Sequence, residues 1–430
     1  GKIMIALVMF IVCLLMLTLG FPVAFTFGGV ALLFGLYSEG LQLFMLVAYR
    51  MESIMTNVVL MAVPLFIFMG LILEKSGIAE RMLESMGSLF GHVRGGLAVS
   101  TVLVGMMLAA STGVVGASVV TMGLIALPVM LKYNYDKQLA SGVICASGTL
   151  GQIIPPSIVL IILADVLHQP VGDLYRAALL PGLLLVVLYI TYCLSLAYFN
   201  KDAAPPMPRS NKPRALQYWQ AFKAIVPALT LIVVVLGTVI AGVATPTESA
   251  AMGAVGAVLL ALIGGNLKFT MLHQVAMETT KISAMVFTIL AGATFFSMVF
   301  TYTGGDEAVE QIMEHLPGGK WGFVVLMMVI IFLLGFFIDF VEIAYIFIPM
   351  IAPILLTQGI DPLWFGILVA LNLQASFLTP PFGFSLFYLR GVAPPSVSTP
   401  DIYRGVIPFI FLQLVTLAVV ILFPGIVRVF

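Results

Sequence analysis

Two acidic side chains, Asp339 and Glu342, stand in an otherwise apolar stretch, residues 335–344, which begins with Gly335. A carboxylate in apolar surroundings is costly unless it is paired, hydrated or bound to an ion. Carboxylate, hydroxyl and carbonyl oxygens are the ligands that hard cations prefer, so this stretch is a candidate Na⁺ site. The alternative is that the two carboxylates form a structural pair with a base.

Three other apolar runs, residues 110–118, 147–157 and 372–381, are interrupted by small, polar and proline residues. Their candidate binding residues are Ser111, Thr112, Gly113, Gly116 and Ser118; Ser147, Gly148, Thr149, Gly151, Gln152, Pro155, Pro156 and Ser157; and Asn372, Gln374, Ser376, Thr379, Pro380 and Pro381. Because a proline removes a hydrogen-bond donor and restricts the residue before it, we expect the chain to unwind at both proline pairs. The alternative for a single hydroxyl is a bond to the carbonyl four residues earlier, and for a small residue the close approach of two helices.

The elements that carry these residues are apolar. Of the 430 residues 61% are hydrophobic and 9% are charged, whereas roughly a quarter of the residues of a soluble domain are charged. Apolar runs of about 17 to 25 residues recur along the chain, which is the length of a membrane-spanning helix. The sequence therefore predicts an all-α polytopic membrane protein, and its formal net charge of zero offers no basic field for nucleic acid.

The chain also resembles a duplication. At an offset of 225 residues Pro128 matches Pro353, Asp136 matches Asp361, and the proline pair at 155–156 matches the pair at 380–381. A polar, proline-rich linker at residues 200–218 separates the halves. We expect five spanning helices and one re-entrant hairpin in each half, and the odd number of crossings makes the halves inverted.

The predicted spans are residues 3–20, 22–37, 54–74, 137–167, 172–199, 220–243, 247–264, 282–302, 362–390 and 401–424, and the predicted hairpins are residues 95–133 and 321–356. Short amphipathic pieces are expected at 79–90 and 307–316. Inverted repeats with broken helices have a binding site near the bilayer midplane, where free amides favour anions and free carbonyls favour cations.

Basic side chains fall unevenly on the two predicted sides of the membrane. Of the 19 basic residues only five lie opposite the linker: Lys2, Arg50, Arg176, Lys320 and Arg428. Because Lys and Arg accumulate in cytoplasmic loops, the linker is predicted to be cytoplasmic and both termini periplasmic. The first hairpin would then open from the cytoplasm and the second from the periplasm.

Four stretches carry a family resemblance in combination. They are NVVLMAVPLFIFMG at residues 57–70, GTLGQIIPPS at 148–157, TPTESAA at 245–251 and LTPPFG at 378–383. Together they resemble the large membrane subunit of tripartite ATP-independent periplasmic (TRAP) transporters, often called DctM-like, and the resemblance covers essentially the whole chain.

The resemblance implies Na⁺-coupled uptake of a carboxylate-bearing organic anion, such as a C4-dicarboxylate or sialic acid, by an elevator movement in the bacterial inner membrane. The moving segments would be residues 95–170 and 321–392, and the scaffold residues 1–94, 171–320 and 393–430.

By the same resemblance one Na⁺ would lie between the first hairpin tip and the 147–157 break, and another between the second tip and the 372–381 break. The substrate would lie between them, against Gly116, Gln152, Pro155, Pro156, Ser157, Pro380 and Pro381. The second tip departs from the first, because Asp339 and Glu342 stand where the first tip has small and apolar residues.

The implied partners are a four-helix small membrane subunit, separate or fused before residue 1, and a periplasmic substrate-binding protein. No cofactor is implied beyond Na⁺ as the coupling ion. An ATP-driven pump and an enzyme are disfavoured, because the sequence has no G-x-x-x-x-G-K-[ST] loop and no H-E-x-x-H or G-x-S-x-G motif. The alternative that stays open is a standalone Na⁺-coupled dicarboxylate symporter, which would need no binding protein.

Overall fold

The computed structural model describes residues 2–112, 115–209, 211–380 and 383–430, without the side chains at 2, 109–112, 115–117, 384 and 387. Within these ranges every regular element is a helix, as the composition predicts. Before the linker the helices are α1 (Lys2–Thr18), α2 (Val23–Glu39), α3 (Gln42–Met55), η1 (Val59–Met61), α4 (Ala62–Lys75), α5 (Ile78–Phe90), α6 (Gly96–Thr112), α7 (Val115–Lys132), α8 (Lys137–Thr149), η2 (Leu150–Gln152), α9 (Ile158–Val166) and α10 (Val171–Phe199). After it they are α11 (Arg214–Ile240), α12 (Pro246–Ile263), α13 (Phe269–Tyr302), α14 (Gly305–Glu314), α15 (Gly319–Leu334), α16 (Phe340–Glu342), the π-helix η3 (Ile343–Phe347), α17 (Ile348–Thr357), α18 (Pro362–Leu378), α19 (Phe384–Val392), α20 (Thr399–Leu422) and η4 (Pro424–Arg428).

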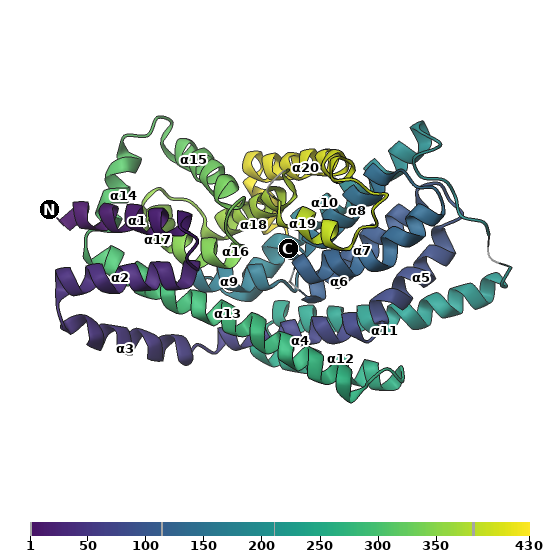
Figure 1. The fold of residues 1–430 in the computed structure, drawn as a ribbon, viewed down its shortest axis with the longest axis horizontal. Helices are drawn as coiled ribbons and strands as arrows, with labels where there is room; N and C mark the ends of the chain where they lie inside the picture. The colour runs from purple at the N-terminus through teal and green to yellow at the C-terminus, as the bar shows by residue number, and fades with distance from the viewer. Residues whose placement is uncertain (1, 113–114, 210, 381–382) are drawn as a thin grey trace.

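The same order of elements recurs on the two sides of the linker. Two helices (α1 and α2; α11 and α12) precede a long helical stretch (α3 to α4; α13) and a short amphipathic helix (α5; α14). A hairpin (α6–α7; α15–α17), a broken helix (α8–α9; α18–α19) and a closing helix (α10; α20) follow. In Figure 1 the two hairpins lie on opposite sides of the region where the broken helices meet.

Two predicted boundaries are wrong, and one helix was not predicted. The missed helix is α3, which precedes the span predicted at 54–74 and meets the helical segment Val59–Lys75 at a bend of 57°. Arg50 and Glu52 interrupt the apolar run there and hid this helix. Likewise α13 begins at residue 269 and not at 282, and the linker ends before Arg214 because α11 starts there.

The ten predicted spans are not all continuous helices. Among the described residues six helices are long and apolar enough to cross a membrane, or up to eight if each of two bent pairs is one span. One of the six, residues 340–357, lies in the predicted second hairpin. The helices α1 and α2 have 17 residues each, and the spans predicted at 137–167 and 362–390 are interrupted.

Both predicted breaks are shorter than expected. Helix α8 runs through Ser147 and Gly148 to Thr149, and α18 runs through Asn372 to Leu378. Polar side chains leave the backbone bonds of a helix intact, whereas a proline cannot donate one and disfavours helical geometry in the residue before it. In the second half the helix accordingly ends at the residue two positions before Pro380.

Small residues allow the tightest helix crossings. A Cβ on Gly142 of α8 would lie 2.1 Å from the carbonyl oxygen of Gly405 on α20, and a Cβ on Gly292 of α13 would lie 2.2 Å from that of Ala24 on α2. Lipid tails are as apolar as leucine side chains, so close packing of this kind is a main source of helix association in membranes.

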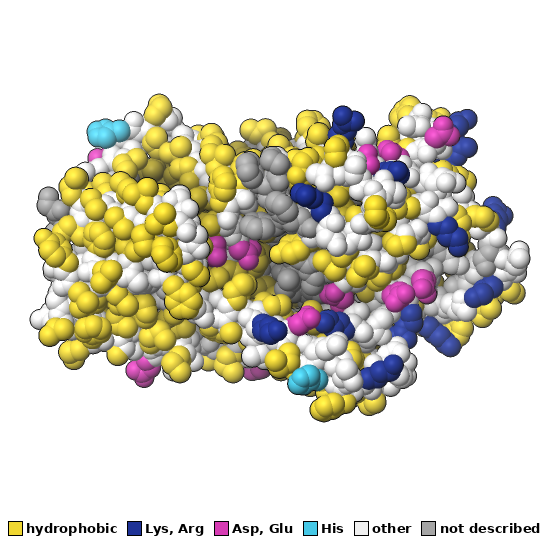
Figure 2. Space-filling model, viewed as in Figure 1, with side chains coloured by type: hydrophobic (Ala, Val, Ile, Leu, Met, Phe, Trp, Pro, Cys, Tyr) yellow, Lys and Arg dark blue, Asp and Glu magenta, His cyan; other side chains and the backbone are white. Residues whose placement is uncertain are grey.

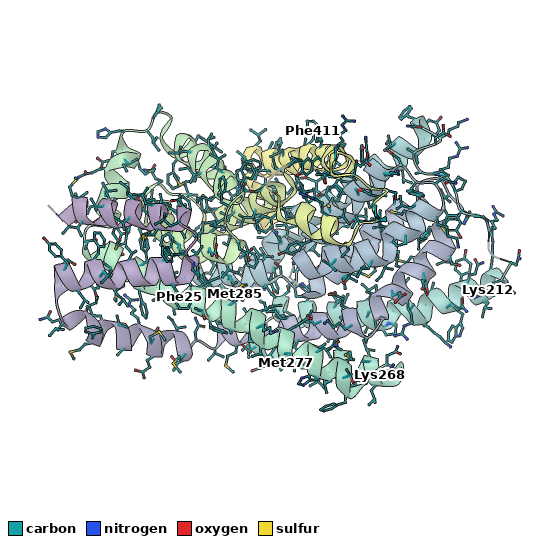
Figure 3. The ribbon with its side chains drawn as sticks, in the orientation of Figure 1. Phe25, Lys212, Lys268, Met277, Met285 and Phe411 are labelled. Atoms are coloured by element: carbon teal, nitrogen blue, oxygen red, sulfur yellow. The ribbon has the colours of Figure 1, made fainter. Side chains whose placement is uncertain are left out.

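The surface divides into an apolar and a basic region. In Figure 2 hydrophobic side chains cover most of the half that holds the N-terminus, while Lys and Arg gather toward the opposite end. Phe25, Met285 and Phe411, which are labelled in Figure 3, are 69%, 45% and 65% exposed. Exposed aromatic and thioether side chains suit contact with lipid tails.

Candidate functional site

The two broken helices meet at their interruptions. Thr149 is the last residue of α8, and its carbonyl oxygen accepts a hydrogen bond from Nε2 of Gln374 in α18, at 2.9 Å. These two residues are 225 positions apart, the offset of the duplication. Both side chains are fully buried.

A third helix contributes to this contact. Gln413 of α20 donates from Nε2 to the hydroxyl of Tyr189 in α10 at 2.6 Å and to Oγ1 of Thr149 at 3.4 Å. Sequence reasoning missed Gln413 and Tyr189. A lone amide within the apolar run 402–422 was the available signal, because buried polar groups in membrane helices are costly without a role.

Several buried polar atoms near this contact have no hydrogen-bond partner among the described residues. They are Oγ of Ser147, both Nε2 and Oε1 of Gln152, Oδ1 of Asn372, and Oε1 of Gln374 and of Gln413. An unpaired buried donor or acceptor costs about 1–3 kcal/mol. A group of them on two interrupted helices is therefore best explained by ligands that pair with them.

Both helices of the first hairpin pack closely against the end of α8. A Cβ on Gly105 of α6 would lie 2.5 Å from Cβ of Ser147, and a Cβ on Gly148 would lie 2.3 Å from Cγ2 of Val119 in α7. Gly105 and Gly148 therefore have a packing role. Beyond the break the Ser157 hydroxyl donates to the Gln152 carbonyl at 3.2 Å and accepts from the Leu160 amide, so it caps α9.

In the second half α15 is bonded to α18. Nδ2 of Asn372 donates to the Met328 carbonyl at 2.7 Å, and Oγ of Ser376 donates to the Phe332 carbonyl at 2.8 Å. A Cβ on Gly335 would lie 2.2 Å from that Ser376 oxygen, so only glycine fits there. Thr379 has the local role that was the alternative to ion binding, because its hydroxyl donates to the carbonyl of Ala375, four residues earlier.

Asp339 and Glu342 have a local structural role. Oδ1 of Asp339 accepts from the Phe340 amide at 2.7 Å. The Asp339 side chain also accepts from the Glu342 amide, and Oε2 of Glu342 accepts from the Asp339 amide at 3.2 Å; these two bonds form a capping box at α16. In the described part of the chain neither carboxylate forms an ion pair with a base. The structural pair with a base is thus not found there, and Oε1 of Glu342 takes no part in the capping box.

The other candidate residues are divided between described and undescribed positions. Ser118, Gly151, Pro155 and Pro156 are buried, and Pro380 is partly buried. Ser111, Thr112, Gly113, Gly116 and Pro381 lie outside the described residues, as backbone or as side chain. The tip of the first hairpin therefore stays a prediction.

Two polar contacts join α4 and the residues just before it to neighbouring segments. Sequence reasoning missed both contacts. Nδ2 of Asn57 donates to Oδ1 of Asp165 at the end of α9, at 2.9 Å. At the other end of α4 the Thr121 hydroxyl of α7 donates to Oε1 of Glu74. One stretch of chain is thus bonded to both the first hairpin and the first broken helix.

Interrupted membrane helices that meet with free polar groups at their contact are typical of secondary transporters. Residues 7–426 match the family model described as the DctM component of the tripartite ATP-independent periplasmic transporter. The chain belongs to this family and is a TRAP transporter large membrane subunit.

Two relatives support this assignment, and one solved structure shares the fold. The C4-dicarboxylate TRAP transporter large permease protein DctM of Rhodobacter capsulatus is 30% identical over 98% of this chain and 97% of its own. The protein of the same description from Pseudomonas aeruginosa is 31% identical over 85% of this chain and 84% of its own. The crystal structure of the Alcanivorax borkumensis YdaH transporter matches with a TM-score of 0.62 at 15% identity and covers 98% of both chains, which shows a shared fold.

Proposed function

We propose that this chain moves a carboxylate-bearing organic anion, such as a C4-dicarboxylate or sialic acid, across the bacterial inner membrane together with Na⁺. The observation that carries the proposal is the group of unpaired buried atoms at the meeting of the broken helices: Ser147, Gln152, Asn372 and Gln374. Amide and hydroxyl groups can donate to a carboxylate and can also bind Na⁺ through oxygen. The R. capsulatus and P. aeruginosa relatives are named for C4-dicarboxylates, which supports this substrate class.

The helix ends at the breaks support binding of both charges. The C-terminal ends of α8 and α18, which carry free carbonyls, stop at the breaks, and the N-terminal ends of α9 and α19, which carry free amides, begin there. Free carbonyls favour Na⁺ and free amides favour a carboxylate. Gly383, which precedes α19, gives that helix no side-chain cap, so a substrate oxygen could accept from its first amides.

An inverted repeat and an elevator movement complete the proposal. The recurring element order supports the repeat, as does the bond between Thr149 and Gln374, which match at the duplication offset. Residues 95–170 and 321–392 would move together against the remaining helices. The gathering of Lys and Arg at one end in Figure 2 supports a cytoplasmic linker and periplasmic termini.

Asp339→Asn is expected to lower the apparent Na⁺ affinity of transport by roughly tenfold, because it removes a charge from the proposed second ion site. Asparagine caps a helix about as well as aspartate, so the thermal stability should stay within about 0.5 kcal/mol of wild type. The measurement is uptake against Na⁺ concentration. An unchanged Na⁺ dependence would restrict Asp339 to its capping role.

Thr121→Val is expected to shift the elevator equilibrium away from the described conformation. The hydroxyl bond to the Glu74 carboxyl contributes about 0.5–1.5 kcal/mol, and a moving hairpin would keep it in this conformation only. Spin labels at exposed Lys132 and Lys268 would report the change as a new distance population. Thr191→Val is the matched control, since its hydroxyl bonds within its own helix; equal distributions in both variants would contradict the expectation.

The proposal is tested by uptake into proteoliposomes that hold this chain with its small membrane subunit. Labelled C4-dicarboxylate or sialic acid is supplied with and without an inward Na⁺ gradient, and with and without a purified periplasmic binding protein. We expect uptake to require both. Na⁺-dependent uptake without the binding protein would make this chain a self-sufficient symporter, and uptake without the gradient would overturn the ion coupling.

A further inference from the structure

A cavity of about 1110 Å³ opens between α5, α11 and α12, and no residue of the broken helices lines it. Its apolar wall includes Val226 and Pro227 of α11 and Leu260 and Ile263 of α12. The hydroxyls of Ser85 and Ser88 on α5 line the same space. It therefore combines a polar side with an apolar side.

The charged groups of the cavity are mainly basic. Arg81, Lys212 and Lys223 line it, against the single carboxylate of Glu84. The Arg81 guanidinium reaches the end of α12, where a Cβ on Gly264 would lie 3.2 Å from its Nη2. In the described part of the chain neither Arg81 nor Lys223 belongs to an ion pair. Two positive charges at this cavity thus lack an anionic partner.

Aromatic side chains beside the cavity are of the kind found at headgroup depth. Lys223 lies with its Nζ 5.0 Å from the ring centre of Trp219, and that ring stacks on Phe222 at 5.8 Å. Trp219 and Phe222 are both about half exposed, and only 22% of the apolar window of α11 is buried. Tryptophan concentrates at membrane–water interfaces. Figure 2 shows that basic side chains gather toward the end of the molecule opposite the N-terminus, and Figure 3 shows that Lys212 lies at that end.

We propose that this cavity binds a phospholipid with an anionic headgroup. The phosphate would lie between Arg81 and Lys223, where a guanidinium can donate two parallel bonds to it, and an acyl chain would follow the apolar wall. Charge complementarity selects this occupant, because a transmembrane helix of a protein partner would cover the wall but leave both charges unpaired. The site is independent of the transport site, so its test does not depend on substrate or Na⁺.

Tryptophan quenching by brominated lipid tests the proposal beside the cavity, because the Trp219 ring lies 5.0 Å from Nζ of the lining residue Lys223. The purified chain is placed in phosphatidylcholine nanodiscs with increasing fractions of brominated phosphatidylglycerol or, in parallel, brominated phosphatidylcholine. Subtracting the signal of a Trp219→Phe variant isolates Trp219 from Trp321 and Trp364. We expect phosphatidylglycerol to quench Trp219 at a much lower fraction than phosphatidylcholine does.

Removing the charges should weaken this preference on the order of fivefold for each basic group. Arg81→Gln combined with Lys223→Gln is then expected to require about 25-fold more phosphatidylglycerol, while Arg81→Lys keeps most of the preference and shows that the fold tolerates the change. Lys268→Gln is the matched control, a basic residue beyond α12 that does not line the cavity. Equal quenching by both lipids, an equal loss in the Lys268→Gln variant, or loss of lipid quenching when the small subunit is co-purified would overturn the proposal.

Discussion

Replacing Gln152 with leucine is expected to abolish uptake while leaving the folded protein as stable as wild type or more stable. Both polar atoms of this fully buried side chain lack a partner among the described residues. Leucine removes that cost, since an apolar group of similar shape in place of an unpaired polar one is neutral or stabilising. Loss of two bonds to a charged substrate, about 1.5–3 kcal/mol each, should lower uptake at least about 100-fold.

Thermal unfolding and initial uptake rates of the same preparations measure both parts of this expectation. Gln413→Leu is the contrasting variant, because Gln413 bonds to Tyr189 and its loss leaves that hydroxyl buried without a partner. It should destabilise by about 1–3 kcal/mol. If Gln152→Leu destabilises as much as Gln413→Leu and still transports, Gln152 has a structural role and the site is misplaced.

Gly142→Ala and Gly405→Ala are expected to cost about 3 kcal/mol each, the largest stability losses expected here. A Cβ on Gly142 would lie 2.1 Å from the Gly405 carbonyl oxygen, and a Cβ on Gly405 would lie 2.0 Å from the Gln138 carbonyl oxygen. Both obstructions are backbone, so no side chain can move aside, and α8 and α20 must separate. Because α8 carries Ser147 and Thr149 into the site, transport by the surviving protein should fall as well.

Yield of folded protein and its unfolding temperature measure this loss. Gly237→Ala in α11 is the control, since no atom lies within 4 Å of its added Cβ. Alanine favours a helix over glycine by about 1 kcal/mol, so this control should be neutral or stabilising. Wild-type stability of Gly142→Ala would show that the two helices do not cross as tightly as described.

Much of the fold could be predicted from local chemistry. Apolar length predicted the helical class, and the predicted ends of the helices α10 and α12 agree with the structure within one residue. The break before Ile158 was predicted because prolines cannot donate. Helix prediction failed where charged residues lie within a helix. Arg50 and Glu52 interrupt the apolar pattern of α3, so this helix was not predicted, although an exposed helix end tolerates both residues.

The candidate site was harder to predict, because polarity alone does not distinguish a ligand from a structural partner. Ser376 and Thr379 bond to backbone carbonyls, and Ser157 caps a helix. The side chain of Gln152, in the same kind of stretch, has no partner among the described residues. Gln413 comes from a helix more than 30 residues along the chain from either break. Only the three-dimensional crossing of α8, α18 and α20 brings it to Thr149.

Binding of radioactive Na⁺ to the purified complex, with and without the organic anion, tests most directly whether one site at the broken helices holds both. If the anion and Na⁺ contact each other in one site, each raises the affinity of the other by the same factor. We predict that the anion raises Na⁺ affinity in the wild type and has no effect in Gln152→Leu. Na⁺ binding that ignores the anion in the wild type, or that responds equally in the variant, would contradict a shared site at this crossing.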